Sequence, residues 1–244
     1  MKIVATIEAR MTSSRLPGKV MLKVLNKPIL GYLVERLKTI KCIDEIVLAT
    51  TTNITDDVLE NFAKEYNISC FRGSENNVLD RIINAGKKAN ADIIVEITGD
   101  CPIIDPSIVD QTIKIFINNN VHYVSNNHIR SYPDGMDVQV FKLQTLINSS
   151  KLTNDKLDQE HVTLFIRNHP ELFSKINIIA PFDLHWPELG ITLDEESDFQ
   201  LLKKIIENFE NNNKNFSCND IIKFLISNPS LLELNNTVVR KGDS

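Results

Sequence analysis

The sequence predicts an α/β fold in which a mainly parallel, mixed β-sheet is flanked by helices. Short β-branched apolar runs alternate with stretches whose apolar residues recur at helical spacing, which is typical of strand–helix–strand crossovers. The chain has 244 residues, of which 42% are hydrophobic, and this is enough to bury one large core. No run of 18 apolar residues occurs, so the sequence predicts no membrane-spanning helix.

The first hundred residues repeat one unit, a strand followed by a polar loop and a helix. Strands are predicted at 2–7, 45–50, 69–71 and 93–97, and helices at 29–37, 56–66 and 78–89. Parallel sheets bind ligands beyond the carboxyl ends of their strands. We therefore expect the functional groups in the loops that follow these strands.

The pattern changes in the second half of the chain. Helices are predicted at 108–116, 143–149, 159–168, 196–208 and 219–226, and strands at 123–125, 137–141, 176–180 and 190–193. We interpret about 130–185 as a small subdomain inserted on the main sheet. Residues 1–210 form the main domain in this interpretation, and residues 211–244 form a linker (211–215) with a C-terminal helical tail.

Charge and cysteine content exclude several classes of function. The chain carries 27 Lys and Arg against 32 Asp and Glu, a net charge of −5, and it has no basic run, so we expect no nucleic-acid partner. Its four cysteines are far apart and lack zinc-site spacing, which favours reduced structural thiols. The N-terminal apolar run is too short and too soon charged for a signal peptide, so we expect a soluble cytoplasmic protein.

The loop after the first strand has the composition of a phosphate-binding site. It contains three cations, Arg10, Arg15 and Lys19, together with hydroxyl side chains and Gly18. Backbone N–H groups, hydroxyls and cations in such a loop suit a triphosphate. The loop lacks the glycines of a Walker A or a dinucleotide fingerprint. The alternative interpretation is a solvated polar loop.

Two aspartates are candidates for a magnesium site. Asp100 follows the strand at 93–97, and Asp194 follows the strand predicted at 190–193. Mg²⁺ usually takes one or two protein carboxylates and completes its shell with water and phosphate oxygens. Each residue alone is equally compatible with a helix cap or a turn.

The predicted subdomain and its neighbours contain polar residues suited to a second substrate. Glu160 and Arg167 are spaced to share one face of the helix predicted at 159–168, with His161 beside them. A tight turn contains Asp134, and Asn126 follows the strand at 123–125. An acidic or polyhydroxylated acceptor would suit this set. His161 is equally compatible with a structural role.

Seven strings in the chain together resemble one enzyme family, the cytidylyltransferases that activate acidic sugars, such as acylneuraminate and 3-deoxy-manno-octulosonate. The match is nearest to the branch of spore-coat polysaccharide biosynthesis proteins of SpsF type. The strings are AR-x-x-SSRLPGK (9–19), FRGS-x-x-x-VLDR (71–81), ITGDCPIIDP (97–106), YVSN (123–126), YPDGMDV (132–138), EHVT-x-FIRNHP (160–170) and LDEE-x-D (193–198). They occur in the family order and cover the chain from residue 1 to about 240.

The resemblance implies a nucleotide-diphospho-sugar transferase-like, Rossmann-like fold and a dimer that pairs through the inserted subdomain. It implies CTP and an acidic or phosphorylated acceptor as substrates, and Mg²⁺ as cofactor. The catalytic residues it implies are Arg10, Lys19 and Asp100, and the metal ligands are Asp100 and Asp194. The nucleotide contacts are Ala9, Arg10, Ser13, Arg15, Gly18, Lys19, Arg72, Ser74, Arg81 and Thr98, and the acceptor contacts are Asn126, Asp134, Glu160, His161 and Arg167.

The chain departs from the family pattern at two positions. Glu8 stands where relatives commonly have Gln or Pro, and Cys101 follows the metal aspartate where octulosonate enzymes have Glu. Direct transfer of the octulosonate substrate is therefore in doubt.

The sequence predicts a Mg²⁺-dependent cytidylyltransferase that transfers CMP from CTP to an acidic sugar or related acceptor, in the synthesis of surface polysaccharide precursors. One alternative is a phosphorylated sugar or alditol acceptor, which gives a CDP-linked product. A non-catalytic nucleotide-binding protein and a glycosyltransferase are further alternatives. Retention of Arg10, Lys19, Asp100 and Asp194 argues against the former, and the RLPGK loop argues against the latter.

Overall fold

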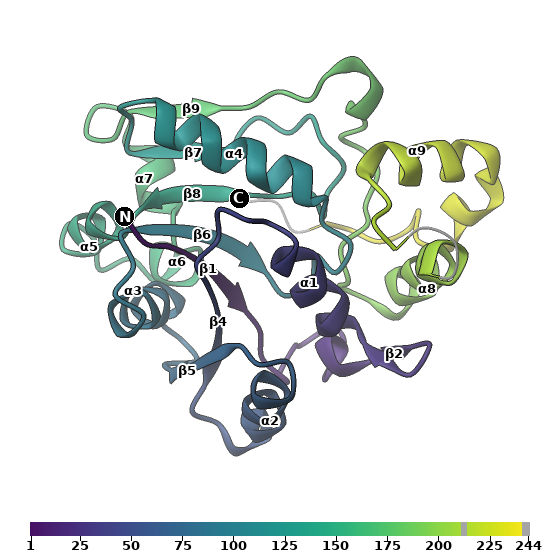
Figure 1. Ribbon diagram of the computed structural model, residues 1–244, viewed down its shortest axis with the longest axis horizontal. Coiled ribbons are helices and arrows are strands. Elements are labelled where there is room, and N and C mark those ends of the chain that lie inside the picture. The colour runs from purple at the N-terminus through teal and green to yellow at the C-terminus, as the bar shows by residue number, and fades with distance from the viewer. Residues whose placement is uncertain (211–213, 241–244) are drawn as a thin grey trace.

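A seven-stranded sheet forms the centre of the molecule (Figure 1), and the computed structural model describes residues 1–210 and 214–240. The strand order is β5-β4-β1-β6-β8-β7-β9. β1 (Ile3–Glu8) pairs in parallel with β4 (Glu45–Thr51) and with β6 (Ile93–Thr98), and β4 pairs in parallel with β5 (Ser69–Gly73). The predicted α/β fold and the strands predicted in the first hundred residues are confirmed.

The other half of the sheet contains the single reversal of direction in its described strands. β8 (Gln139–Lys142) runs antiparallel to β6 and to β7 (Tyr123–Ser125), and β9 (Lys175–Asn177) adds to β7 in parallel. Because β8 pairs between β6 and β7, a strand from the predicted insertion belongs to the main sheet. The division of the chain into domains stays a prediction.

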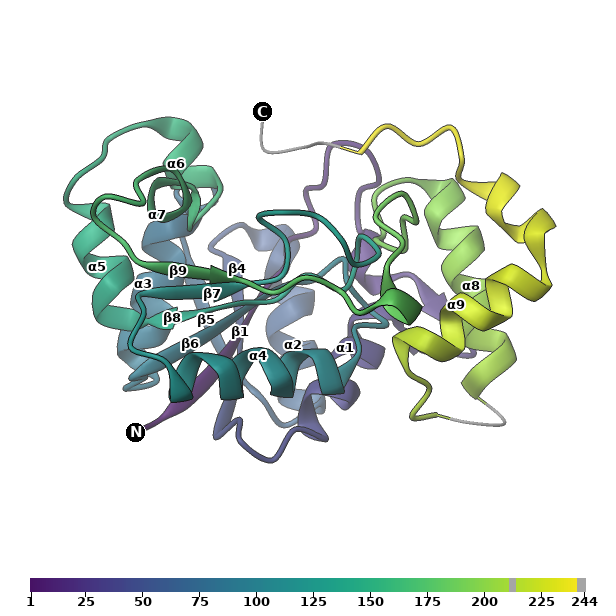
Figure 2. The same ribbon diagram turned by 90° about the horizontal axis from the view of Figure 1, so that it is seen from above.

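Helices cover both faces of the sheet, and Figure 2 shows α4 on one side of the strands and α6 and α7 on the other. The α-helices are α1 (Ile29–Lys38), α2 (Asp57–Glu65), α3 (Val78–Lys88), α4 (Pro106–Asn118), α5 (Leu143–Ser150), α6 (Lys156–Glu160), α7 (Leu164–Asn168), α8 (Glu196–Glu210) and α9 (Cys218–Ser227). Minor elements are η1 (Lys19–Met21), β2 (Lys23–Val24), β3 (Lys27–Pro28), η2 (Ile54–Asp56), η3 (Phe182–Leu184) and η4 (Pro229–Leu234).

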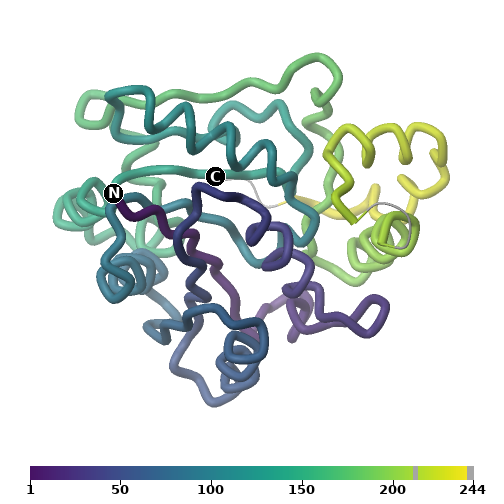
Figure 3. The backbone as a smooth tube through the Cα atoms, in the orientation of Figure 1, coloured from purple at the N-terminus to yellow at the C-terminus, as the bar shows by residue number. Residues whose placement is uncertain are grey.

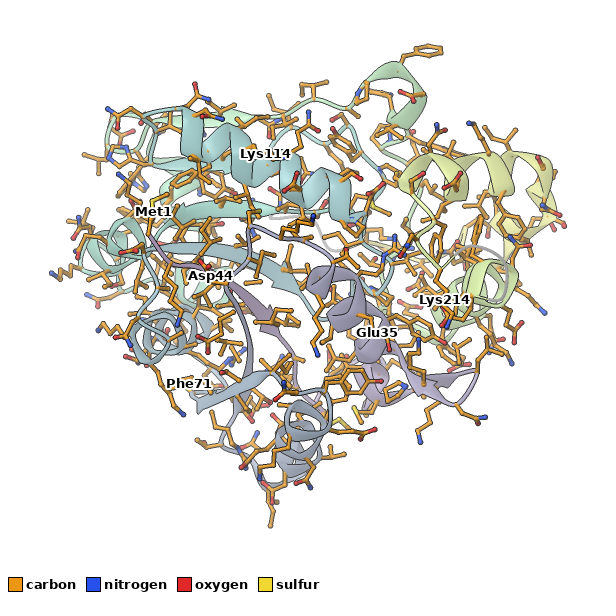
Figure 4. All side chains as sticks on the ribbon, in the orientation of Figure 1. Met1, Glu35, Asp44, Phe71, Lys114 and Lys214 are labelled. Atoms are coloured by element: carbon orange, nitrogen blue, oxygen red, sulfur yellow. The ribbon has the colours of Figure 1, made fainter. Side chains whose placement is uncertain are left out.

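Two apolar clusters fill the space between the sheet and the helices. The larger joins one face of β1 and β6 to α1, α4, α8 and α9, and the smaller joins the other face to α3, α5 and α7. Phe71, labelled on the edge strand β5 in Figure 4, packs against the smaller cluster. Buried leucine and isoleucine side chains of this kind are worth about 1.5–3 kcal/mol each, so these clusters are the main source of stability.

On the face covered by α3, the strands change from apolar to polar toward one edge of the sheet. Side chains alternate along a strand, so Val4 of β1 shares this face with Glu8, and Ile94 of β6 shares it with Glu96 and Thr98. The apolar members pack under α3, whereas the polar members lie beyond it. The fold thus leaves a polar floor at the carboxyl ends of β1 and β6.

The helix predicted at 159–168 is wrong, because the structure divides it into α6 and α7. Val162 lies between them with φ 41°, a left-handed conformation that a β-branched residue rarely adopts. Its side chain is 1% exposed in the smaller cluster, and the Thr163 hydroxyl donates to Gln139 Oε1 at 2.5 Å. These tertiary contacts override helix continuation. Glu160 and Arg167 therefore do not share one helix face.

The strand predicted at 190–193 is also wrong. Gly190 forms an isolated bridge with Asp134, and no ladder continues from it in the described chain. Ile191 N donates to Asp134 O at 2.8 Å, and Leu193 N donates to Asp100 O at 2.8 Å. The segment connects two different loops with one hydrogen bond to each, which explains why an apolar alternating run does not pair as a strand here.

The C-terminal part of the chain packs on the main body rather than beside it. Figure 3 traces it from α8 through α9, whose Cys218, Ile221 and Leu225 belong to the larger cluster. Residues 211–213 of the predicted linker and residues 241–244 of the tail lie outside the described residues. Across the residues that the structure describes, no helix combines the length and apolarity needed to cross a membrane.

Candidate functional site

The loop after β1 is fixed to its neighbours by two carboxylates. Asp56, which is fully buried, accepts hydrogen bonds from Met11 N at 2.8 Å and from the hydroxyls of Thr50 and Thr51. Glu75 accepts from the Thr12 hydroxyl at 2.5 Å and pairs with Arg10 at 3.4 Å. The loop is therefore a preorganised structure, in agreement with a binding role and not with a freely solvated loop.

The ammonium of Lys19 lies between the two aspartates predicted as metal ligands. Its Nζ is 3.1 Å from Asp100 Oδ2 and 3.0 Å from Asp194 Oδ1. Burial alone would lower the pKa of Lys19, but the charges of Asp100 and Asp194 and their hydrogen bonds raise it overall. Residues from three distant parts of the sequence thus converge, and the strand-end rule accounts for Lys19 and Asp100, which lie in the loops after β1 and β6.

Asp100 is held in its ionised form. Burial would raise its pKa, yet the Lys19 charge, the Thr98 hydroxyl and the hydrogen bond from Lys19 lower it overall. The Thr98 hydroxyl donates to Asp100 Oδ1 at 2.6 Å, while Lys19 contacts the other oxygen. A carboxylate fixed at both oxygens has a defined orientation.

Asp194 is positioned by the start of α8. Its backbone N–H donates to Asp198 Oδ2 at 3.0 Å, and Asp198 is fully buried. Arg15 from the first loop contacts Asp194 Oδ1 at 2.8 Å. The side chain of Asp194 therefore faces Arg15 and Lys19 even though no strand precedes it.

The pair Asp100 and Asp194 fits a divalent cation. Both carboxylates contact a single ammonium at about the same distance, so their oxygens already converge on one cationic position. The described residues contain no group of three or more His, Cys, Asp or Glu side chains suited to a metal. A site with two carboxylates suits Mg²⁺, which takes its remaining ligands from water and phosphate, better than it suits Zn²⁺.

A cavity of about 290 Å³ lies between the first loop, α3 and the carboxyl end of β6. Most of the predicted nucleotide contacts line it, and so do both predicted metal ligands. Its lining includes Ala9, Arg10, Ser13, Arg15, Lys19, Arg81, Thr98, Asp100 and Asp194. The structure therefore brings together residues that the sequence places in four separate motifs.

Arg81 forms the inner wall of this cavity with Glu8. Its side chain is almost fully buried, and burial lowers its pKa although Glu8 acts in the opposite sense. Arg81 Nη1 donates to Ser74 O at 2.6 Å. Burial raises the pKa of Glu8, and a hydrogen bond with Glu96 and the charge of Arg81 only partly offset this rise.

A second cavity, of about 260 Å³, adjoins the first. The two share seven lining residues, namely Glu8, Arg15, Thr98, Asp100, Glu160, His161 and Asp194. Four of the five predicted acceptor contacts line it, namely Asp134, Glu160, His161 and Arg167. Glu96 from the polar floor and the neighbouring Gln139 of β8 line it as well. Two ligands that occupied these cavities would meet beside Asp100.

Three predicted nucleotide contacts lie outside both cavity linings. Arg72 donates to the backbone oxygens of Thr51 and Asn53 and pairs with two carboxylates of α2, so it connects α2 to β4. Ser74 contributes its backbone oxygen to Arg81 instead of a side chain to the cavity. Gly18 turns the loop with φ 73° and donates to Met11 O at 2.8 Å.

Asn126 lies outside the cavities too, since it is 1% exposed and joins two backbone segments. Its Nδ2 donates to Met136 O at 2.7 Å, and its Oδ1 accepts from Val138 N at 2.8 Å. These bonds use its side-chain amide to position the turn that contains Asp134. The residue type alone does not indicate this structural role, because a sequence does not distinguish a buried asparagine from an exposed one.

Several residues of the site were not predicted from the sequence. Arg130 and Arg240 line the second cavity, and Asp56 and Glu75 fix the first loop. Arg130 pairs with Asp134 at 3.0 Å. Opposite charges four residues apart indicate a pair on a helix, and this segment is not helical, so the sequence gives no signal for this contact. Nothing near Arg240 in the sequence indicates a contact with residues 190–198.

Comparison with known proteins gives concordant matches over nearly the whole chain. A sequence model described as Cytidylyltransferase matches residues 4–242. The chain is 33% identical to the spore coat polysaccharide biosynthesis protein SpsF of Bacillus subtilis, over 93% of this chain and 95% of that protein. It is 27% identical to the 3-deoxy-manno-octulosonate cytidylyltransferase of Geobacter metallireducens, over 67% and 69% of the two chains.

A solved structure gives the same result in three dimensions. The structure of a cytidylyltransferase from Leptospira borgpetersenii superposes with a TM-score of 0.92 and is 34% identical in sequence. The superposition covers 98% of this chain and 100% of the other chain. The likeness therefore includes the segments that carry both cavities.

Proposed function

The chain belongs to the cytidylyltransferase family of CTP-dependent nucleotidyltransferases, and from that premise we propose that it transfers CMP from CTP to an acidic sugar or related acceptor with release of pyrophosphate, using Mg²⁺. The observation that carries the proposal is the position of Lys19 Nζ between Asp100 and Asp194, at the junction of two cavities. The junction is where the α-phosphate of one ligand and the nucleophile of another would meet.

The first cavity suits the nucleotide. Arg10, Arg15 and Lys19 extend from the fixed loop and supply positive charge along a triphosphate. Arg81 and backbone groups beside it supply donors and acceptors farther from the loop. These cations oppose the charge that accumulates on the departing pyrophosphate, and such preorganised electrostatic stabilisation is usually the largest contribution in nucleotidyl transfer.

Asp100 and Asp194 would hold Mg²⁺, which when bound supplies Lewis-acid polarisation of phosphate and acceptor oxygens. The acceptor oxygen forms a bond to the α-phosphorus, and the bond from that phosphorus to the bridging oxygen of the β-phosphate breaks. The acceptor hydroxyl loses its proton to solvent, and pyrophosphate carries away the electron pair of the broken bond. Thr98 fixes Asp100 at 2.6 Å while this occurs.

The second cavity suits the acceptor. Asp134, Glu160 and His161 offer acceptors and donors for sugar hydroxyls, and Arg167 offers a positive charge. The name of the Bacillus subtilis relative supports a surface polysaccharide precursor as the product, and that of the Geobacter relative supports an acidic sugar as the acceptor.

Pyrophosphate release tests the proposal. The four nucleoside triphosphates are assayed with and without Mg²⁺, each with 3-deoxy-manno-octulosonate, an acylneuraminate or ribitol 5-phosphate as acceptor. We expect release that requires CTP, Mg²⁺ and an acceptor, and a loss of about 10²–10³-fold in Asp100→Ala. Asp110→Asn, on the surface of α4, is the matched control. Release that is independent of the base, or full activity in Asp100→Ala, would contradict the proposal.

We also propose that the protein is a homodimer that pairs through residues 130–185. Large apolar side chains are exposed there, among them Leu172 (51%), Ile179 (52%) and Phe182 (100%). β9 lies at the end of the strand order of the described sheet, beside this surface. Sedimentation equilibrium of the wild type and of Phe182→Ser should give a dimer that the substitution weakens. A wild-type monomer at all concentrations would contradict this arrangement.

A further inference from the structure

Residues 235–240, which follow η4, cross over the loop that carries Asp194, and we call them the strap. Asn235 fixes the start of the strap, because its Nδ2 donates to Gly190 O at 3.0 Å and to Asp198 Oδ1 at 2.8 Å. Near the other end, Val239 O accepts a hydrogen bond from Arg15 Nη1 at 3.3 Å. Figure 2 shows the yellow segment after η4 returning across the molecule toward the purple first loop.

The guanidinium of Arg240 packs against the backbone of Gly190 and pairs with the buried carboxylate of Asp198. Its Nη2 is 2.7 Å from Asp198 Oδ1, and its Nη1 donates to the Thr192 hydroxyl at 2.6 Å. A Cβ atom added to Gly190 would lie 2.1 Å from Nη2 and 2.3 Å from Cζ and Nε. The guanidinium therefore rests directly on the Gly190 backbone, where only glycine leaves room for it.

The other edge of this guanidinium faces the second cavity. Arg240 lines that cavity, with Nε 3.8 Å from Asp134 Oδ2 and Nη1 3.9 Å from Asp194 Oδ2. Both distances exceed a hydrogen bond. Of the five N–H donors of an arginine, two make hydrogen bonds to described residues of the chain, so the remaining donors are available to a ligand.

We propose that Arg240 is an acceptor-binding residue, whose guanidinium donates hydrogen bonds to an anionic group of the acceptor, a carboxylate or a phosphate. The proposal rests on the transferase activity proposed above. A guanidinium binds either anion in a bidentate manner, and its planar shape fixes the orientation of the group it holds. Because Arg240 lies beside Asp194, an acceptor held by it would present its neighbouring oxygens to the junction of the cavities.

The chain offers a test in which the guanidinium is displaced without being removed. Gly190→Ala places a methyl group where the guanidinium of Arg240 lies, and the flexible Arg240 side chain can move away. Arg240→Gln removes the positive charge, and Arg240→Lys keeps the charge but lacks the planar pair of N–H donors that binds an anion in a bidentate manner. Val239→Ala is the matched control, since that side chain is 80% exposed and the strap keeps its backbone contact. In Arg240→Gln, Asp198 still accepts hydrogen bonds from the backbone N–H of Asp194 and from the side-chain amide of Asn235.

Binding is measured by calorimetry in the presence of Mg²⁺ and cytidine 5′-(α,β-methylene)triphosphate, a CTP analogue that cannot transfer CMP. The titrants are 3-deoxy-manno-octulosonate for a carboxylate and ribitol 5-phosphate for a phosphate. We expect Arg240→Gln and Gly190→Ala to weaken binding of one titrant by about 10- to 100-fold, and Arg240→Lys to recover part of the loss. Val239→Ala should bind like the wild type, and the affinity for the CTP analogue should change less than about twofold in every variant.

Three results would overturn the proposal: unchanged titrant affinity in Arg240→Gln and Gly190→Ala, an equal loss of titrant and CTP-analogue affinity, or binding of neither titrant to the wild type. Turnover is measured separately by pyrophosphate release. Wild-type turnover that survives unchanged in Arg240→Gln refutes the role of Arg240 and leaves the proposed function intact. Arg240-dependent binding without turnover refutes the proposed function and leaves the role of Arg240 intact.

Discussion

The ammonium of Lys19 lies 3.1 Å from a carboxylate oxygen of Asp100, and the same nitrogen lies 3.0 Å from Asp194. Lys19 is 13% exposed at its side chain, so this contact is screened by little water. The single positive charge of Lys19 thereby offsets part of the repulsion between two carboxylates, and Arg15 pairs with Asp194 as well. This relationship gives Lys19 a structural role in addition to the role proposed for it with the nucleotide.

Lys19→Met should therefore destabilise the protein and also sensitise it to magnesium. We expect a loss of about 2–4 kcal/mol of unfolding free energy, near the lower end for breaking a buried ion pair. Mg²⁺ alone should then raise the melting temperature more in the variant than in the wild type, because a divalent cation replaces the missing charge. Thermal melts with and without Mg²⁺ measure both effects.

Lys27→Met is the control for that experiment. Lys27 also bridges two carboxylates, Glu35 at 2.7 Å and Glu210 at 2.8 Å, but it lies outside both cavities. We expect its loss to lower stability without a magnesium effect. An equal magnesium effect in both variants would show that Asp100 and Asp194 have no special affinity for the metal.

Arg72→Gln and Arg81→Gln should separate the two arginines that the family resemblance treats alike. Arg81 lines the first cavity, proposed above for the nucleotide, so we expect its substitution to weaken CTP binding by about 10- to 100-fold. Arg72 is occupied between β4 and α2, so its substitution should change CTP affinity less than about twofold. Calorimetric titration with CTP and Mg²⁺ measures both, and equal losses would restore Arg72 to the nucleotide site.

Asn126→Ala should act on folding and not on binding. The substitution leaves Val138 N–H and Met136 C=O buried without their partner, and each such group costs about 1–3 kcal/mol. We expect an unfolding free energy lower by about 2–4 kcal/mol in urea denaturation. At a temperature where the variant is folded, its KM for the acceptor should match the wild type, and a large rise in KM would mean that Asn126 contacts the acceptor.

Glu8→Gln should change how stability depends on pH. Burial raises the pKa of Glu8 above 4.5, so above pH 4.5 the folded protein keeps a proton that the unfolded chain has lost. Wild-type stability from this group is therefore greatest below pH 4.5 and is lost as pH rises through the raised pKa. Glu8→Gln does not lose this stability. The unfolding free energy of the variant minus that of the wild type, measured by urea denaturation at each pH, should therefore increase as pH rises.

Glu45→Gln supplies a comparison of opposite sign. Burial would raise the pKa of Glu45, but hydrogen bonds from Lys2 and Ser69 and the charge of Lys2 lower it overall. Its stabilisation is present above pH 4.5 and is lost as pH falls through the lowered pKa. Glu45→Gln should therefore lose stability relative to the wild type at neutral pH. The same direction in both variants would contradict the assigned pKa shifts.

The sequence was sufficient for the groups that parallel-sheet geometry brings together. Lys19 lies in the loop region after β1 and Asp100 follows β6, and because these strands are adjacent, parallel-sheet geometry places both loops at the same edge of the sheet. Asp194 was predicted for the wrong reason, since in the described structure no strand ends directly before it. Its position depends on Leu193 N and Asp100 O, a contact between two loops.

The remaining errors have a common physical origin in long-range packing. Val162 interrupts a helical pattern because its side chain is buried against α3 and α5, and no local rule contains that information. Asn126 and Arg72 have the residue types of a binding site, yet backbone groups distant in sequence occupy their donors and acceptors. Arg240 reaches the site only because η4 reverses the chain toward Gly190.

The contact of the strap with the first loop has a consequence for biosynthesis. Arg15 and Val239 are separated by 224 positions, so the ribosome makes the first loop long before it makes the strap that binds to it. Contacts between such distant residues form late because closing a long chain segment costs entropy. The central strands can thus form early in synthesis, whereas the second cavity is complete only after Arg240 has left the ribosome.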